Sequence, residues 1–154
     1  MVGKIKYIFL IFFLFGAFSA TLKSQDIQAI AVIVNDEVIS RYDVNQRVRL
    51  ILVTSGIPAT EENIKRIEEQ AIKALIDEKI QIQEAIKLEV PDSPNEINLM
   101  LDNIARSNQT TAEGILESIT SQGVNSETLL NQIKSELLWN KIVRGRFGSY
   151  INIS

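Results

Sequence analysis

Five helix-start signals lie between residues 40 and 125, and they leave little room for any fold that is not mainly helical. Each signal is a Ser, Thr or Asn whose side chain can accept a hydrogen bond from a free backbone N–H of the first helical turn. Apolar residues spaced three and four apart follow each signal, and this spacing gathers them on one helix face. The predicted caps are Ser40, Thr60, Ser93, Thr110 and Asn125.

Other residues near these caps support the same helix starts. Three caps are followed three positions later by an acid that can bond back to the cap backbone, which is the pattern of a capping box. The pairs are Ser40 with Asp43, Ser93 with Glu96, and Thr110 with Glu113. Pro94 suits the first position of its helix. Val124 and Leu129 occupy the positions of a hydrophobic staple around the cap Asn125.

Gly and Pro residues mark where the predicted helices end. The first helix is expected to end near Gly56, ahead of Pro58. The second is expected to run to about Leu88 and to stop before Pro91. Its wide apolar stripe suggests contact with several neighbours. Gly123 marks the end of the fourth helix.

A small β-hairpin is predicted just before the first helix, in "AIAVIVNDEVIS". Ile30, Val32 and Val34 lie on one side of the first strand, and the β-branched content favours extended structure. Asn35 and Asp36 can occupy the two positive-φ positions of a type I′ turn. Because an isolated hairpin is only marginally stable in water, this one must pack against the helices. We expect it to tie the chain onto the helical core.

The first twenty residues have the layout of a secretory signal peptide. Lys4 and Lys6 precede the apolar run at 8–18, and small residues follow it up to Ala20. The run is shorter than the roughly 20 residues that span a bilayer, so we predict that the leader is cleaved and does not stay as a membrane anchor. After cleavage, we expect the chain to have no stable membrane insertion. The predicted organisation is a signal peptide at 1–20, a helical domain at 26–147, and the start of a linker or strand at 148–154.

Composition excludes several classes of chemistry. Among 154 residues there is no His and no Cys, which removes a Ser-His-Asp triad, thiol catalysis and thiolate metal sites. A zinc enzyme is therefore not expected. The formal net charge of −3 differs from the positive charge typical of nucleic-acid-binding domains, so nucleic-acid binding is not expected. Adjacent acidic pairs such as Glu61 and Glu62 point in different directions on a helix, so they form no catalytic dyad. We expect no catalytic residues, cofactor or metal.

The apolar content is high enough that one helix face could stay open as a groove for a polypeptide. The predicted third and fourth helices are short, and they are the ones least easily buried on all sides. The predicted peptide-binding residues are Met100, Ile104, Ile115, Ile119 and Trp139, although core packing is the default role for each.

Three stretches resemble the N-terminal region of the SurA-like family of periplasmic chaperones. "IAVIVNDEVISRYDV" is similar to a family stretch that directly follows the signal peptide. "ALIDEKIQIQEAIKLEV" resembles a second family segment, although Leu88-Glu89 departs from the Gly or Asn usual there. The segment from "EINLMLDNIARSNQTTAEGILES" to "LLNQIKSELLWNKIV" follows the family layout of helix break, helix end and final helix. Each motif is loose, but their order and spacing are specific.

The resemblance implies an ATP-independent chaperone module in the periplasm of a Gram-negative bacterium. Its implied partners are unfolded outer-membrane polypeptides and the outer-membrane assembly machinery. Longer family members carry parvulin-type prolyl-isomerase domains after this region, and this sequence ends about where the first would begin. The chain is therefore expected to be a truncated, non-enzymatic part. Two alternatives stay open: the leading part of a parvulin-type isomerase, and a membrane-anchored interaction module.

Overall fold

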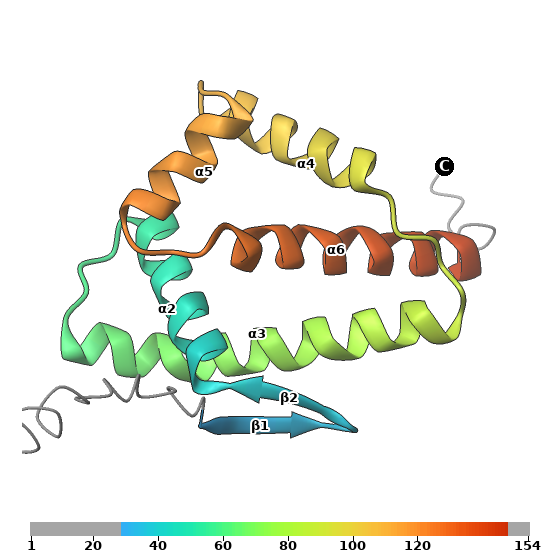
Figure 1. Ribbon diagram of the computed structural model, residues 1–154, viewed down its shortest axis with the longest axis horizontal. Coiled ribbons are helices and arrows are strands. Elements are labelled where there is room, and N and C mark those ends of the chain that lie inside the picture. The colour runs from blue at the N-terminus through green and yellow to red at the C-terminus, as the bar shows by residue number, and fades with distance from the viewer. Residues whose placement is uncertain (1–28, 148–154) are drawn as a thin grey trace, which may run out of the picture.

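A computed structural model describes residues 29–147 as a two-stranded hairpin followed by five helices (Figure 1). The mainly helical fold with a small N-terminal hairpin is thus confirmed. The predicted signal peptide at 1–20 and the segment at 148–154 lie outside the described residues. The elements are β1 (Ile30–Val34), β2 (Glu37–Ser40), α2 (Arg41–Ser55), α3 (Glu61–Lys87), α4 (Pro94–Ser107), α5 (Ala112–Ser121) and α6 (Ser126–Phe147).

The hairpin pairs β1 with β2 in antiparallel register, with Val34 opposite Glu37. Asn35 has a φ of 55°, but Asp36 does not have a positive φ, so the predicted type I′ turn is wrong. A type I′ turn needs positive φ at both central residues, and here only Asn35 adopts it. Val34 is buried, whereas Ile30 is exposed, since the register shifts between Ile30 and Val32 and breaks the strand's alternation.

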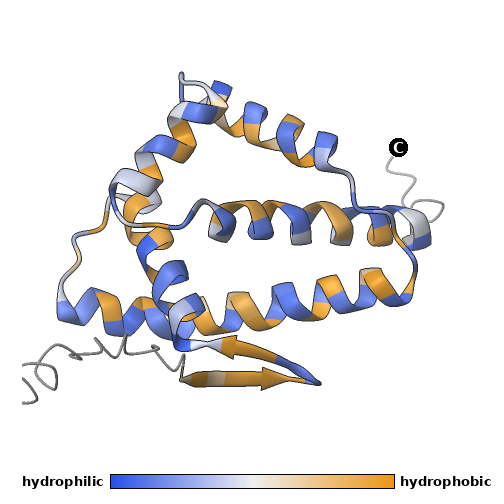
Figure 2. Cartoon of the chain, in the orientation of Figure 1, coloured by the Kyte–Doolittle hydropathy of each residue, from blue (hydrophilic) through white to orange (hydrophobic). Residues whose placement is uncertain are grey.

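The hairpin packs against the helices, as expected. It lies along α3, on the opposite side from α6 (Figure 1). In Figure 2 β1 is almost entirely hydrophobic in colour, and β2 is hydrophobic in its middle. The buried side chains of Val34 and Ile39 contact those of α2 and α3. The N–H of Arg41 donates to the carbonyl of Ala29 at 2.7 Å, which continues the pairing up to the first residue of α2.

Three of the five predicted caps are confirmed. At Ser40 a complete capping box forms: its hydroxyl accepts from the N–H of Asp43, and the Asp43 carboxylate accepts from the N–H of Ser40. The Thr60 hydroxyl accepts from the N–H of Asn63 at the start of α3. Asn125 accepts from the N–H of Glu127 at the start of α6.

The caps predicted for α4 and α5 need correction. Ser93 precedes α4, but its side chain makes no capping bond because its ψ of 98° is far from the 155–164° of the other caps. The Glu96 carboxylate pairs instead with Lys141 of α6. The cap of α5 is Thr111 and not Thr110, because the Thr111 hydroxyl accepts from the N–H of Gly114 at 3.1 Å. The Thr110 N–H donates to the carbonyl of Ala105, so Thr110 belongs to the turn that closes α4.

The core is divided into three clusters, and each pair of clusters is joined by one helix. The hairpin cluster contains side chains of the hairpin, α2 and α3. The α4–α5 cluster contains side chains of α2, α4, α5 and α6. The Ala85 cluster contains side chains of α3, α6 and the segment after α3. Consequently α2, α3 and α6 each serve two clusters. Figure 1 shows these three helices enclosing the middle of the molecule, with α4 and α5 forming a corner beyond α6.

Candidate functional site

An open groove lies beside α2, and we call it the α2 groove. It has a volume of about 810 Å³, within the range of ligand sites in proteins. It lies at the left of Figure 1, between α2, the connection to α3 and the end of α5. Its lining residues are Asn45, Val48, Arg49, Leu52, Val53, Gly56, Ile57, Pro58, Ala59, Ile64 and Gln122.

The apolar wall of the α2 groove follows from how α2 ends. Gly56 adopts the left-handed conformation, with a φ of 63°, and this reverses the chain after the helix. The N–H of Ile57 then bonds back to the carbonyl of Leu52 at 3.1 Å. The Asn63 side chain donates to the carbonyl of Pro58 at 2.9 Å, which fixes the connection against the first turn of α3. Ile64 adds a side chain that is 39% exposed.

Arg49 is the one charged residue that lines the α2 groove. One of its terminal nitrogens donates to the carbonyl of Gly123 at 3.4 Å, just after α5. Gly123 lacks a side chain, and an added Cβ would lie 2.8 Å from that nitrogen. The amides of Asn45 and Gln122 complete the polar part of the lining. The groove therefore combines an apolar surface with a single positive charge.

A second, smaller cavity of about 250 Å³ lies beside a buried polar junction of α2, α3 and α6. Arg47 of α2 pairs with Glu78 of α3, and also donates to Gln132 and to the carbonyl of Thr128 in α6. Burial raises the pKa of Glu78 and outweighs the opposing effect of the Arg47 guanidinium. Because these side chains already bind one another, we interpret the junction as structural.

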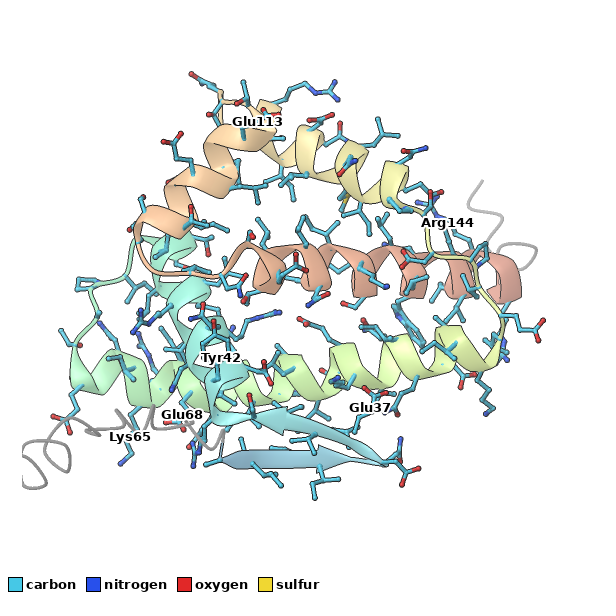
Figure 3. The ribbon with its side chains drawn as sticks, in the orientation of Figure 1. Glu37, Tyr42, Lys65, Glu68, Glu113 and Arg144 are labelled. Atoms are coloured by element: carbon cyan, nitrogen blue, oxygen red, sulfur yellow. The ribbon has the colours of Figure 1, made fainter. Side chains whose placement is uncertain are left out.

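The hairpin is bound to α3 by partly exposed polar contacts. The Lys79 ammonium lies 2.7 Å from the carboxylate of Glu37, and Gln83 donates to the other Glu37 oxygen and to the carbonyl of Val34. Figure 3 shows Glu37 at the side of α3 along which the hairpin runs. The hydrogen bonds from Lys79 and Gln83 hold the pKa of Glu37 below its ordinary value.

The structure brings four of the five predicted peptide-binding residues together, and none of the five lines the α2 groove. Met100 and Ile104 of α4 and Ile115 and Ile119 of α5 all belong to the α4–α5 cluster, and Ile119 is only 4% exposed. Trp139 lies apart from them on α6 and is 40% exposed. A role in peptide binding stays a prediction for all five.

Residues of the α2 groove were not singled out from the sequence. Val48, Leu52 and Ile64 fit helical stripes and suggested only core packing. The signal that could have found the groove is "GIPA", which places Ile57 and Pro58 in a connection where polar turn residues are usual. An apolar connection indicates that the loop is itself packed on something.

Within residues 29–147, no group of three or more acidic side chains is placed to hold a metal ion. No helix in the same range combines the length and apolar character that crossing a membrane requires.

Comparison with known proteins places this fold in a family. Residues 27–143 match the SurA N-terminal domain. Chaperone SurA of Vibrio cholerae is 29% identical over 123 residues, which cover 78% of this chain and 28% of that protein. An uncharacterized protein of Rickettsia conorii is 30% identical over 136 residues, covering 88% of this chain and 44% of that protein. Chaperone SurA of Pseudomonas savastanoi is 26% identical over 135 residues, which cover 84% of this chain and 31% of that protein. The chain thus spans less than half the length of each of these relatives.

Proposed function

The chain belongs to the SurA N-terminal domain family, and from that premise we propose that it is a polypeptide-binding chaperone module. Its proposed clients are unfolded outer-membrane proteins, bound without ATP in the periplasm of a Gram-negative bacterium. The outer-membrane assembly machinery is a further proposed partner. The role proposed is binding, and no residue is assigned to catalysis.

The observation that carries this proposal is the α2 groove. An unfolded chain offers apolar side chains, and a surface that binds it needs an apolar area left open in the folded protein. The α2 groove supplies such an area along Val53, Ile57 and Ile64. Its cavity of about 810 Å³ has room for several client side chains.

The proposal is tested by diluting a urea-unfolded outer-membrane β-barrel protein into buffer, with and without the full chain, in the absence of ATP. We expect the chain to suppress light scattering from aggregates and to bind the client saturably, as measured by fluorescence anisotropy. Absence of both effects would overturn the proposal.

A matched pair of variants ties the activity to the groove. Ile64→Ser removes an apolar side chain of the α2 groove, whereas Ile86→Ser removes one that is 69% exposed elsewhere on α3. Client binding should weaken by about tenfold in Ile64→Ser, since burying an Ile side chain is worth about 1.5–3 kcal/mol in full. Ile86→Ser should bind as the parent chain does. Equal effects of the two substitutions would place the binding surface elsewhere.

A further inference from the structure

We propose that the α2 groove selects client segments in which an acidic side chain is flanked by apolar residues, and that Arg49 binds the carboxylate. This inference rests on the proposed chaperone function and names the chemistry of the segments that the groove prefers. It depends on charge complementarity between one guanidinium and one carboxylate at the edge of an apolar surface.

The lining of the α2 groove contains one positive charge and no acidic residue. The other lining residues are apolar, apart from the amides of Asn45 and Gln122. A purely apolar peptide would leave Arg49 beside a surface that excludes water, with no counter-charge. A peptide with a carboxylate at this position would supply one, while its neighbouring side chains cover Val53 and Ile64.

Arg49 is placed for such a contact. The carbonyl of Gly123 accepts from one terminal nitrogen at 3.4 Å and holds the guanidinium at the end of α5. Among residues 29–147, no carboxylate lies within 4 Å of Arg49, whereas Arg41 and Arg47 each pair with a glutamate of α3. A guanidinium has five N–H donors in a planar fork that matches a carboxylate, so most of its donors remain for a ligand.

The expected ligand is an acidic side chain within a polypeptide. One guanidinium provides a single charge, which suits one carboxylate and not the repeated phosphates of a nucleic acid. The groove extends along α2 and the connection to α3, so it accommodates residues on both sides of the acid. A carboxylate at the very end of a chain is the competing source, and the experiment separates the two.

Fluorescently labelled peptides of identical apolar–serine sequence, with a central Glu, Gln or Lys, provide the test. Both ends are blocked, so that the central side chain is the only variable charge. Binding to the full chain is measured by fluorescence anisotropy. We expect the Glu peptide to bind about fivefold more tightly than the Gln peptide, as for a partly exposed ion pair, and the Lys peptide to bind most weakly.

Substitution of Arg49 should change the preference without abolishing binding. In Arg49→Gln, the Glu and Gln peptides should bind equally, and in Arg49→Glu the Lys peptide should become the tightest. Arg106→Gln is the matched control, because Arg106 is an exposed arginine of α4 that does not line the α2 groove. It should keep the preference of the parent chain. Circular dichroism of each variant checks that the helices are intact.

The outcomes separate this inference from the chaperone proposal. Equal binding of the three peptides to the parent chain overturns the role of Arg49 and leaves apolar client binding in place. No binding of any peptide overturns both. A Gln peptide with an unblocked C-terminus that binds better than the blocked Glu peptide shows that the chain end is the ligand, which also contradicts this inference.

Discussion

The guanidinium of Arg47 faces the carboxylate of Glu78 squarely, so that each terminal nitrogen contacts a different carboxylate oxygen, one of them at 2.8 Å. The two side chains are only 4% and 14% exposed. They join α2 to α3, and the further bonds of Arg47 to Gln132 and Thr128 extend the junction to α6. The three helices that connect the core clusters therefore meet at one buried ion pair.

Breaking this pair from one side should destabilise the fold strongly. Arg47→Met or Glu78→Leu leaves the other charge buried without its counter-charge, which typically costs about 3–5 kcal/mol. The double variant Arg47→Met/Glu78→Leu removes both charges and should recover most of the loss, to within about 1–2 kcal/mol of the parent. Urea unfolding of all four proteins measures the coupling, and additive losses in the double variant would contradict the prediction.

Ser40 and Ser93 precede different helices, but only Ser40 makes a side-chain capping bond. Ser40→Ala should lower the free energy of unfolding by about 0.5–2 kcal/mol. Ser93→Ala is the matched control and should change it by no more than about 0.5 kcal/mol. Thermal or urea unfolding gives both values. A larger loss in Ser93→Ala than in Ser40→Ala would show that the capping geometry is misassigned.

Gly56 and Gly123 both adopt positive φ, but their surroundings differ. An added Cβ at Gly56 meets nothing within 4 Å, whereas at Gly123 it would lie 2.8 Å from the Arg49 guanidinium. Gly56→Ala should therefore cost only the backbone strain of about 1–2 kcal/mol. Gly123→Ala should cost a similar amount and, in addition, displace Arg49. We expect Gly123→Ala to reduce the preference for the Glu peptide, as measured by anisotropy.

The contact of Glu37 with Lys79 and Gln83 should make the hairpin sensitive to acid. Because these bonds lower the pKa of folded Glu37, their stabilisation is fully present above the ordinary value of 4.5 and is lost as pH falls through the lowered pKa. Glu37→Gln should cost about 0.2–1 kcal/mol at neutral pH, since the pair is partly exposed, and nothing once Glu37 is protonated.

Urea unfolding at neutral and acidic pH tests this expectation. Glu113→Gln is a suitable control, because Glu113 is paired with no cation among the described residues and lies at the far corner of the molecule (Figure 3). A pH-independent cost of Glu37→Gln would show that the ion pair contributes nothing.

Helix positions could be predicted from the sequence because their signals are local. The Ser40 capping box and the Gly56 helix end depend on residues within a few positions of one another. Local rules failed at Thr110 and Thr111, where two neighbouring hydroxyls were both candidates. The Thr110 backbone closes the last turn of α4, and the Thr111 hydroxyl makes the capping bond of α5. Local rules also failed at Ser93, because its ψ of 98° keeps the side chain from making a capping bond.

The candidate site could not be predicted in the same way, because its parts come from distant elements. Arg47 stands in "VNQRVRL" and resembles an ordinary surface residue, yet its burial depends on Glu78, 31 positions away. The Arg49 guanidinium reaches the carbonyl of Gly123 in a later connection, where the missing side chain leaves space for it. No periodicity within a single helix encodes either relationship.

A core divided into three parts would ordinarily come apart in stages. In this fold each of α2, α3 and α6 holds two clusters at once, so loosening any one cluster strips a neighbouring cluster of part of its packing. We therefore expect α2, α3 and α6 to unfold together in one cooperative transition. Among the five helices, α4 and α5 are the exceptions, because each belongs to one cluster only. Hydrogen exchange should find their amides the first helical amides to open.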